Sequence, residues 1–362
     1  MNNFFYEDLN QLNDKYLSKY IYSLKKIFKN ENFILGNNVS KFEKNFSKFL
    51  NTNYCISVNS GLDALFLSLK SLNLEKGSEI ILPSNAYIAA VFAILNAGLK
   101  PIFVEPKIDT YNIDPNLIIK KITKKTKAIL IVHLYGKPCE MDKILKICKS
   151  KKLFLIEDCA QSHGAKFKDK FTGTFGDFGC FSFYPTKNLG SIGDGGSIIS
   201  KTKVNFNLIK KIRNYGSLKK NVHENIGFNS RLDEVQAAFL NIKLKDLNKI
   251  NIHKQKLAKV YLENLSDKFL KPIIQKDIKD VFHIFPIRFN DRNKLIKYLN
   301  LKKIATLIHY PTPPYRQPFF KKNIKEAFPI SDRIHKTILS LPISTNYTEL
   351  DIFKITKIIN KF

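Results

Sequence analysis

The residue with the most distinctive chemical surroundings is Lys187, the one lysine in a segment of small, aromatic and glycine residues at 178–200. Alternating stretches at 179–183 and 196–200 predict two short strands, and Pro185 with several glycines predicts a tight loop between them. A lysine among apolar neighbours loses solvation for its ammonium form, so its pKa falls and its amine becomes nucleophilic near neutral pH. That is the chemistry of a Schiff-base lysine. An ordinary loop lysine with a water-facing amine fits this segment alone equally well.

A carboxylate and a phosphate-binding turn are predicted elsewhere in the chain. Asp158 follows the apolar strand predicted at 153–156, where an unpaired carboxylate is costly, so a cationic partner is expected. The residues Ser60, Gly61 and Leu62 join a predicted strand to a predicted helix. Their hydroxyl and backbone amides lie at the positive end of that helix, which suits a phosphate group. This junction is a weak signal by itself, because many such turns bind nothing.

Ser182 and Tyr87 complete a set of residues that fits one cofactor. Ser182 could donate a hydrogen bond to a phosphate, and Tyr87 offers an aromatic ring for stacking. An imine-forming lysine, a carboxylate for a protonated ring nitrogen, a phosphate cup and a stacked ring are the requirements of pyridoxal 5′-phosphate. Taken singly, Asp158 could cap a turn, Ser182 could be a plain strand serine and Tyr87 could belong to the core. Taken together they predict this cofactor, with Lys187 moving protons as general acid and base.

The elements that must position these residues alternate along the chain. Repeated strand–helix units with continuous apolar strands predict an α/β fold whose mostly parallel sheet is covered on both faces. Ligands of such sheets bind beyond the carboxyl ends of the strands. Asp158, Ser60 and the loop after Pro83 are therefore expected at one edge of the sheet. The strands before the Lys187 segment are predicted at 54–58, 79–82, 101–105, 128–133 and 153–156.

The last third of the chain predicts a second, smaller domain. A long helical pattern at 232–265, with a break expected near 248–251, forms the bridge to it. We therefore divide the chain into a large cofactor-binding α/β domain at 1–245 and a small C-terminal α+β domain at 246–362. The elements expected in the small domain are strands at 281–289 and 305–309 and helices at 291–299, 332–339 and 349–362.

The charge of the chain narrows the function classes. Its 362 residues include 60 Lys and Arg against 31 Asp and Glu, a formal net charge of +29. The lysines are spread along the chain, without a nucleic-acid-binding motif, an aromatic-interleaved basic stripe or a basic tail. Nucleic-acid binding is therefore not expected. A basic surface would instead attract an anionic small molecule such as a nucleotide sugar.

The sequence also predicts a location. No apolar run approaches the roughly 18 residues of a membrane span, and the N-terminus has neither the basic start nor the apolar core of a signal peptide. The five cysteines are scattered without a Cys-x-x-Cys pair, so neither a disulfide framework nor a metal site is expected. We expect a cytoplasmic protein that does not enter a membrane.

Three motifs carry a resemblance to a known family. They are EDCAQSHGA at 157–165, FSFYPTKNLG at 181–190 and GFNSRLDE at 227–234. Together they resemble the DegT/DnrJ/EryC1/StrS family of sugar aminotransferases, and the resemblance extends over nearly the whole chain. It implies the fold type I architecture of pyridoxal-phosphate transferases and a homodimer with a shared active site.

The resemblance also implies a role for each site residue. Lys187 would hold the cofactor covalently, Asp158 would pair with its ring nitrogen, and Gln161 would lie near the ring hydroxyl. Asn229 would reach the phosphate from the neighbouring subunit. The presence of Lys187 favours transamination over the dehydration that relatives without the lysine perform. The remaining cofactor contacts would come from the ring of Tyr87 and from the phosphate-binding residues Ser60, Gly61, Leu62 and Ser182.

The substrate can be narrowed by further motifs. The segments at 214–217, 223–224, 227–231 and 306–314 resemble the branch of the family that aminates a dTDP-linked 3-keto-6-deoxyhexose. That branch makes 3-amino-3,6-dideoxyhexoses of the Fuc3N or Qui3N kind, usually with L-glutamate as amino donor, for cell-surface polysaccharide such as lipopolysaccharide O-antigen. The candidate residues of the hexose pocket are Tyr184, His309 and Tyr310. Tyr315 departs from the branch, in which histidine follows the prolines.

Two other functions stay open at this point. One is a 4-amino sugar-nucleotide aminotransferase that acts on a UDP-, dTDP- or GDP-linked 4-keto-6-deoxyhexose, such as a GDP-perosamine-type enzyme. The other is a non-catalytic relative that binds the cofactor and regulates transcription. The intact Lys187 and the lack of a DNA-binding extension argue against the regulator.

Overall fold

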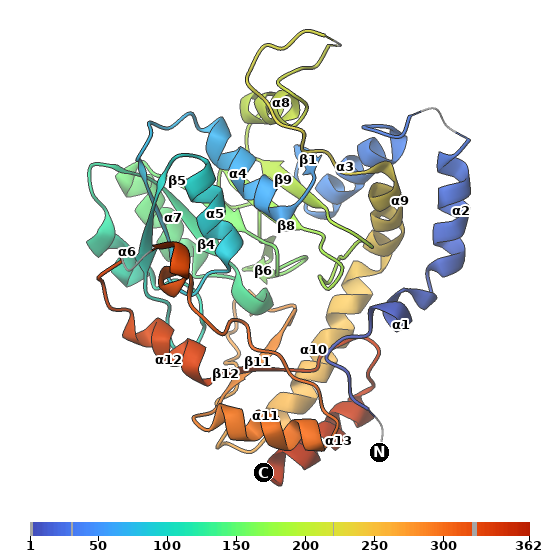
Figure 1. Ribbon diagram of the computed structural model, residues 1–362, viewed down its shortest axis with the longest axis vertical. Coiled ribbons are helices and arrows are strands. Elements are labelled where there is room, and N and C mark those ends of the chain that lie inside the picture. Colours follow the sequence, from blue (N-terminus) through green and yellow to red (C-terminus); the bar gives the residue numbers. More distant parts are fainter. Residues whose placement is uncertain (1–2, 30–31, 220, 321–323) are drawn as a thin grey trace.

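A seven-stranded sheet forms the centre of the computed structural model, which describes residues 3–29, 32–219, 221–320 and 324–362 (Figure 1). Its strand order is β1-β9-β8-β5-β4-β2-β3. The pairs β2–β3, β2–β4, β4–β5 and β5–β8 are parallel, whereas β9 is antiparallel to both β1 and β8. The mostly parallel α/β sheet is therefore confirmed. The strands are β1 (Cys55–Val58), β2 (Glu79–Pro83), β3 (Lys100–Val104), β4 (Thr126–Val132), β5 (Phe154–Asp158), β8 (Phe178–Ser182) and β9 (Gly196–Ser200).

Helices cover both faces of this sheet because successive strand side chains point to opposite faces. In β4, Ala128, Leu130 and Val132 pack with helices of one face, and Ile129 and Ile131 pack with helices of the other. The first face carries α4 (Gly61–Ser71), α5 (Ile88–Asn96) and α8 (Lys203–Ile212). The second face carries α3 (Asn37–Phe49), α6 (Pro115–Lys121), α7 (Met141–Lys151) and α9 (Glu234–Lys243).

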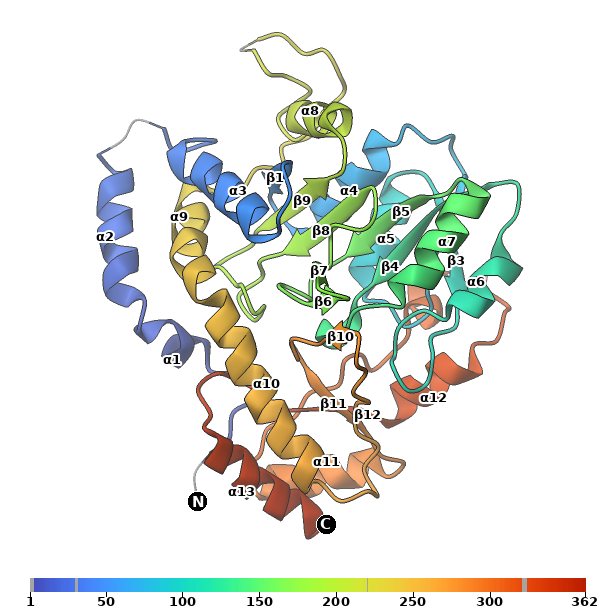
Figure 2. The same cartoon turned by 180° about the vertical axis from the view of Figure 1, so that it is seen from behind.

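The C-terminal part has its own hydrophobic cluster, which forms around a two-stranded antiparallel sheet. The helix pattern predicted at 232–265 continues from α9 through a short 3-10 turn, η2, into the long helix that leads to this cluster (Figure 2). Since this turn joins the helices that belong to the two clusters, we propose the boundary between 1–245 and 246–362 there. The elements are η2 (Leu244–Asp246), α10 (Leu247–Asn264), β11 (Phe285–Arg288), α11 (Arg292–Leu301), α12 (Pro329–Thr337), β12 (Ile338–Leu341) and α13 (Glu349–Asn360).

Three predictions for this part of the chain are wrong in detail. The helix predicted at 332–339 ends at Thr337, because the next residues pair with β11 as strand β12. The segment predicted as a strand at 305–309 makes only an isolated bridge, between Leu307 and Ser340 at the edge of β12. The break in the long helix lies at η2 and not near 248–251. For β12, pairing with the distant strand β11 overrides the local helical pattern.

The N-terminal segment lies against both parts of the molecule. Tyr16, Tyr20 and Ile27 pack on α9, whereas Phe4 belongs to the C-terminal cluster. The remaining elements are α1 (Leu9–Asp14), α2 (Leu17–Ile27), β6 (Lys166–Phe167), β7 (Lys170–Phe171), β10 (Ile278–Lys279), η1 (Leu134–Gly136), η3 (Pro314–Arg316) and η4 (Pro318–Phe320).

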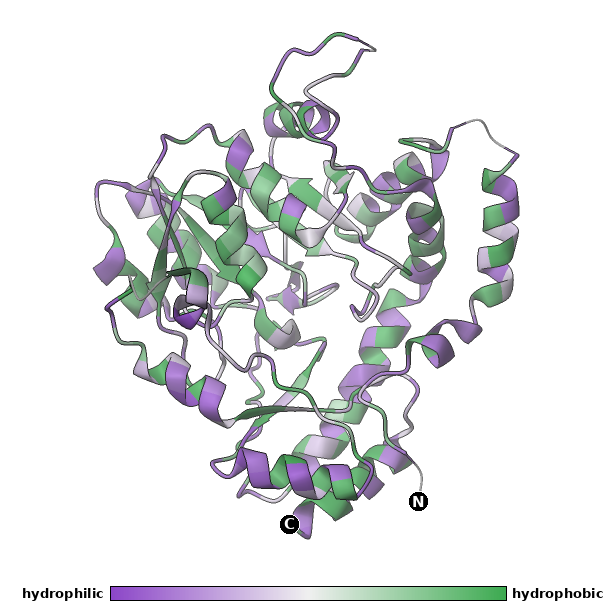
Figure 3. Ribbon diagram, viewed as in Figure 1, coloured by the Kyte–Doolittle hydropathy of each residue, from purple (hydrophilic) through white to green (hydrophobic). Residues whose placement is uncertain are grey.

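Hydrophobic residues concentrate in the strands of the central sheet, and hydrophilic residues colour much of the outer helices (Figure 3). This distribution fits a buried sheet flanked by amphipathic helices. Among the helices that the structure describes, none combines the length and the apolar character that a membrane crossing requires.

Candidate active site

A cavity of about 320 Å³ lies beyond the carboxyl ends of β4, β5 and β8. This is the edge of the sheet at which the sequence predicts that the ligand binds. Asn229 is the one predicted site residue that does not line this cavity. The predicted residues that do line it are Ser60, Gly61, Leu62, Tyr87, Asp158, Gln161, Ser182, Tyr184, Lys187, His309 and Tyr310.

Lys187 lies in the loop between β8 and β9, and its backbone amide donates to the carbonyl of Tyr184 at 2.9 Å. This bond closes a turn that directs the side chain into the cavity. Burial lowers the pKa of the amine to about 8, and the negative charge of Asp158 opposes that shift. The lysine is thus partly neutral at a pH where an ordinary lysine is fully charged, as a nucleophilic amine requires.

Asp158 ends β5, where its neighbours on the flanking strands are Val132 and Cys180. Its Oδ1 accepts a hydrogen bond from the amide of Ala160 at 3.0 Å. Burial raises the pKa of this carboxyl, and the Ala160 amide and the charge of Lys187 act in the opposite direction. A cation bound in the cavity, such as a protonated ring nitrogen, would supply the charge partner that this buried carboxylate needs.

The phosphate-binding turn is built from the start of α4 and the end of β8. Ser60 caps α4, with its Oγ accepting from the amide of Asp63 at 3.1 Å. The amides of Gly61 and Leu62 belong to the first turn, where no acceptor exists within the helix. A Cβ added at Gly61 would lie 2.6 Å from the Cβ of Ser182. Only glycine therefore lets the helix N-terminus and the Ser182 hydroxyl converge on one anion.

Gln161 joins the sheet to the C-terminal part beside the cavity. Its Oε1 accepts from the amide of Tyr135 at 2.5 Å, and its Nε2 donates to the hydroxyl of Tyr310 at 3.0 Å. Because an amide nitrogen carries two protons, one N–H of Gln161 is left for a ligand. The ring of Tyr310 also packs against Tyr87, with ring centroids 4.9 Å apart. The ring of Tyr87 is half exposed and available for stacking.

The predicted hexose-pocket residues line the same cavity from two sides. Tyr184 follows β8 and is half exposed, whereas His309 and Tyr310 come from the C-terminal part. The Nδ1 of His309 lies 2.8 Å from the Oγ of Ser340. Burial lowers the pKa of His309 to about 4, so its ring is neutral near pH 7 and offers a nitrogen to a sugar hydroxyl.

Asn229 is exposed and lies outside the cavity, near the end of the segment that connects α8 to α9. It forms an isolated antiparallel bridge with Asn214. Within one chain it therefore has no part in the cavity. This placement is compatible with the expectation that it serves a neighbouring subunit, which stays a prediction.

Sequence reasoning missed several residues of the cavity wall. Asp194 and Thr186 belong to the same loop as Lys187, and membership of that loop was the signal that could have found them. His283 and Ile284 directly precede β11 in the C-terminal part, where no spacing distinguishes them. Their presence shows that the wall is closed by residues distant in the sequence.

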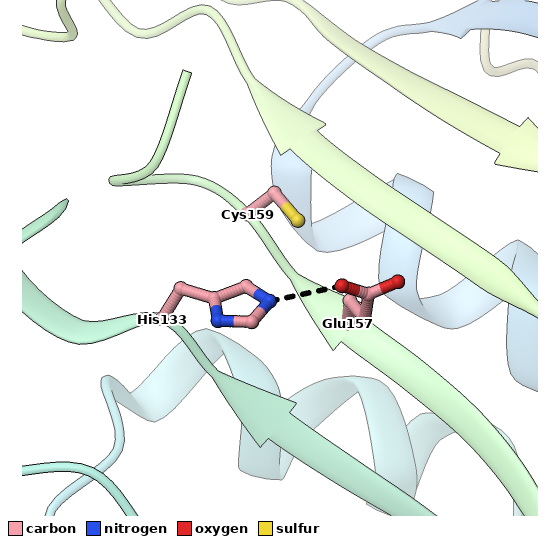
Figure 4. A group of neighbouring side chains, drawn as sticks. All are labelled: His133, Glu157 and Cys159. Atoms are coloured by element: carbon pink, nitrogen blue, oxygen red, sulfur yellow. Dashed lines mark hydrogen bonds and ion pairs between the residues drawn. The ribbon is translucent and has the colours of Figure 1, made fainter. Parts of the chain in front are cut away.

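His133, Glu157 and Cys159 form a second cluster of chemically active groups at the carboxyl ends of β4 and β5 (Figure 4). The Nε2 of His133 lies 3.0 Å from Glu157 Oε2, and its Nδ1 accepts from the amide of Cys139 at 3.0 Å. The proton of the ring is therefore on Nε2, which donates to Glu157. Burial raises the pKa of the Cys159 thiol, which keeps it protonated.

The oxygens of Glu157 are fully engaged by the protein. They accept the His133 bond and the backbone amides of Gly173, Phe175 and Gly176, each of these three at 2.8 Å. A buried carboxylate with these partners holds the loop between β7 and β8 against β5, the strand that also carries Asp158. We therefore assign the cluster a structural role.

The cavity fits pyridoxal 5′-phosphate on the chemistry of its own residues. Lys187 supplies the amine, the buried Asp158 requires a cation, and the glycine-dependent cradle of Gly61 and Ser182 suits a phosphate. Bound there, the cofactor supplies an electron sink for the carbon beside the imine nitrogen. A site of this kind on this sheet defines a pyridoxal-phosphate enzyme of the aminotransferase class.

The chain belongs to the DegT/DnrJ/EryC1/StrS aminotransferase family, whose profile matches residues 17–360. It is 43% identical over 358 residues to the dTDP-3-amino-3,6-dideoxy-alpha-D-galactopyranose transaminase of Aneurinibacillus thermoaerophilus, with 98% of each chain covered. The family resemblance predicted from the three motifs is thus confirmed, as are the aminotransferase activity and the pyridoxal-phosphate cofactor.

Two solved structures show how closely the fold is shared. The structure of DesV from S. venezuelae in complex with a ketimine intermediate has a TM-score of 0.97 and 34% identity, and the match covers 100% of this chain and 98% of that chain. NtdA from Bacillus subtilis with bound cofactor PMP has a TM-score of 0.91 and 29% identity, covering 100% and 86%. The fold type I architecture is therefore confirmed.

Proposed function

We propose that this enzyme transfers an amino group from L-glutamate to C3 of a dTDP-linked 3-keto-6-deoxyhexose. The product is a dTDP-3-amino-3,6-dideoxyhexose of the Fuc3N or Qui3N kind. The observation that carries the proposal is the 43% identity, over 98% of both chains, to a transaminase named for the galacto-configured product. That name favours the Fuc3N configuration.

Different residues of the cavity have different roles in this reaction. Asp158 stabilises the positive charge of the cofactor ring nitrogen, and Ser60, Gly61, Leu62 and Ser182 hold the phosphate. Lys187 would hold the cofactor through its amine, and the same amine would serve as the general acid and base that moves the proton. A pKa of about 8 suits a group that must both accept and donate a proton near neutral pH.

The hexose is held by neutral hydrogen-bonding rings. Tyr184, His309 and Tyr310 line the wall of the cavity and offer hydroxyl and imidazole groups to sugar hydroxyls. His309 is uncharged near pH 7 because burial lowers its pKa to about 4. The keto carbon must face the Lys187 amine, so these three residues decide which carbon of the hexose is aminated.

We propose that two copies of the chain share each active site, with Asn229 of one subunit reaching the phosphate in the other. Two groups of exposed apolar side chains support a dimer. One consists of the exposed side chains of Leu17 and Ile21 on α2 together with Phe28 and Phe33. The other lies in the segment between α8 and α9, in which Ile226 is 92% exposed and Asn229 follows three residues later. Exposed apolar side chains in such numbers indicate a protein interface.

The proposed cellular role follows from the chemistry of the product. A nucleotide-activated amino sugar is a donor for glycosyl transfer, which fits the assembly of a cell-surface polysaccharide such as O-antigen. We propose a cytoplasmic location, since all five cysteines are free and buried, as expected in a reducing compartment. The basic charge of +29 would attract the anionic nucleotide sugar.

The proposal is tested by parallel assays with L-glutamate and dTDP-linked 3-keto and 4-keto 6-deoxyhexoses of both configurations. We expect amination of the 3-keto sugars, with the galacto-configured one turned over fastest, and no activity in Lys187→Ala. Amination of the 4-keto sugar alone would replace the proposal with the 4-amino-sugar alternative. A protein that binds the cofactor and aminates none of the sugars would favour the non-catalytic regulator.

A further inference from the structure

Lys187 lines two cavities, and the second one is not explained by the aminotransferase site. This smaller cavity, of about 30 Å³, is lined by residues of the N-terminal segment, the Lys187 loop, α9 and α10. We call it the lysine cavity. Its charged lining residues are Glu7, Lys15, Lys187, Lys243 and Lys254.

Two of these lysines are buried, with 7% of Lys243 and 4% of Lys254 exposed. Their amines contact only uncharged partners: Lys254 donates to the carbonyl of His283 at 3.2 Å, and Lys243 donates to Asn13 Oδ1 at 3.4 Å. Within the described part of the chain, neither forms an ion pair. Buried ammonium groups without an acidic partner are costly, and Glu7 is the one acid among the residues that line the cavity.

The backbone on both sides of Glu7 is anchored to the C-terminal part of the molecule. Phe4 donates to the carbonyl of Lys303 and accepts from the amide of Ala305, both at 2.8 Å. On the other side, the carbonyl of Asp8 accepts from Asn346 Nδ2 at 3.1 Å. Hydrogen bonds of the residues before and after Glu7 therefore hold it at the lysine cavity, and its position does not depend on contacts with the lysines.

We propose that Glu7 is a positioning residue for the aminotransferase reaction. Its carboxylate balances the positive charge of the buried lysines, so that the Lys187 amine keeps its proton when the reaction needs an acid. The carboxylate attracts the ammonium forms of Lys187, Lys243 and Lys254, whereas Lys254 repels that of Lys187. Burial raises the pKa of Glu7, and the charges of Lys254, Lys243 and Lys187 oppose that shift. Removing the charge of Glu7 leaves the repulsion between Lys254 and Lys187 without this compensation, and Lys187 then loses its proton at lower pH.

Other charged groups also act on Lys187 and must be counted in a test. Asp158 on β5 attracts the ammonium form from the side of the cofactor cavity. The rings of His163, His283 and His309 are kept neutral first by burial and then by the charge of Lys187, so they carry little charge near pH 7. Tyr6 lies beside Glu7, and burial raises the pKa of its hydroxyl, which stays protonated.

The direct test measures the protonation of Lys187 in the cofactor-free protein. Competitive acetylation at a series of pH values, followed by mass spectrometry of the Lys187 peptide, gives the pH at which its amine is half reactive. In Glu7→Gln we expect this midpoint to fall by about half a pH unit or more. Glu7→Asp, which keeps the charge, should restore it. An unchanged Lys187 midpoint in a folded Glu7→Gln protein overturns the proposal.

A second variant keeps the proposal falsifiable if Glu7→Gln does not fold. Lys254→Met removes a charge that repels Lys187, so the labelling midpoint should rise, opposite to the effect of Glu7→Gln. A fall or no change contradicts the account.

Turnover of the holoenzyme provides an independent readout. In Glu7→Gln the alkaline limb of kcat should move to lower pH, with KM for the keto-sugar unchanged, because Lys187 gives up its proton earlier. A uniform loss of kcat at every pH, with the labelling midpoint of Lys187 in place, would assign Glu7 a purely structural role and overturn the proposal.

Discussion

A Cβ on Gly61 would lie 2.6 Å from the Cβ of Ser182 and 3.2 Å from its Oγ. The N-terminus of α4 and the end of β8 therefore meet in a cradle that has room for no side chain at position 61. The same contact joins two segments more than a hundred residues apart in the sequence, and it forms the phosphate end of the proposed cofactor site.

Gly61→Ala is expected to weaken pyridoxal-phosphate binding at least about tenfold, because the new methyl group forces the helix N-terminus away from Ser182. Cofactor titration followed by fluorescence measures the change. Gly77→Ala serves as the control: its backbone has a φ of +81°, so alanine there is strained, but it lies at the amino end of β2, at the opposite edge of the sheet. The control should lower stability and leave cofactor affinity unchanged.

The stability of the cofactor-free protein should depend on pH because the amine of Lys187 is buried. The folded state lowers the pKa of this amine from 10.5 to about 8, so the unfolded chain binds its proton more tightly. Burial of this amine therefore lowers the free energy of unfolding. The loss is fully present below about pH 8, shrinks as the pH rises, and is absent above about pH 10.5. Lys187→Met should therefore gain up to about 3 kcal/mol near pH 7 and lose this advantage near pH 10.5.

Urea unfolding of both proteins at several pH values measures this difference. Lys70→Met, which alters an exposed lysine of α4, is the matched control and should show no such gain. A Lys187→Met protein whose advantage grows with pH would contradict the assigned direction of the pKa shift.

Glu157→Gln should destabilise the fold by about 2–4 kcal/mol, since the new amide nitrogen faces backbone N–H groups that need an acceptor. The control Glu263→Gln alters an exposed residue of α10 and should cost no more than about 0.5 kcal/mol.

Because the partners of Glu157 come from the protein, a chelator should leave the melting temperature unchanged. A lower melting temperature in chelator would show that His133, Glu157 and Cys159 hold a metal.

The shared active site predicts complementation between two inactive variants. Asn229→Ala should bind the cofactor weakly, and Lys187→Ala should not turn over. In a mixed dimer, the site with the intact Lys187 receives Asn229 from the Lys187→Ala subunit. An equal mixture after unfolding and refolding should regain about a quarter of the wild-type activity, because half the dimers carry one complete site. No recovery in a correctly dimeric mixture would mean that each site uses its own chain only.

Most residues of the cavity could be found from the sequence because each follows a strand or starts a helix. Asp158 ends β5 and Ser60 precedes α4, and the sheet brings these ends to one edge irrespective of loop details. The residue types then limit the chemistry. A lone lysine among apolar residues and a carboxylate at the end of an apolar strand each need a partner of opposite charge when they are buried.

Residues brought in by the C-terminal part and the N-terminal segment could not be found in this way. His283 and Glu7 meet Lys187 only after α10 and the anchored N-terminus have packed, and no local spacing encodes that packing. The segment at 305–309 has a strand-like pattern, yet it makes a single bridge because Leu307 lies at the edge of β12. Long-range packing decided these positions.

The central claim is that Lys187 bears the cofactor. Borohydride reduction of the purified yellow holoenzyme, followed by digestion and mass spectrometry, locates the reduced cofactor on a single lysine. The account predicts the pyridoxyl-phosphate mass on the Lys187 peptide and none on Lys243 or Lys254, which are buried nearby. A label on another lysine, or a protein that never takes up the cofactor, would contradict it.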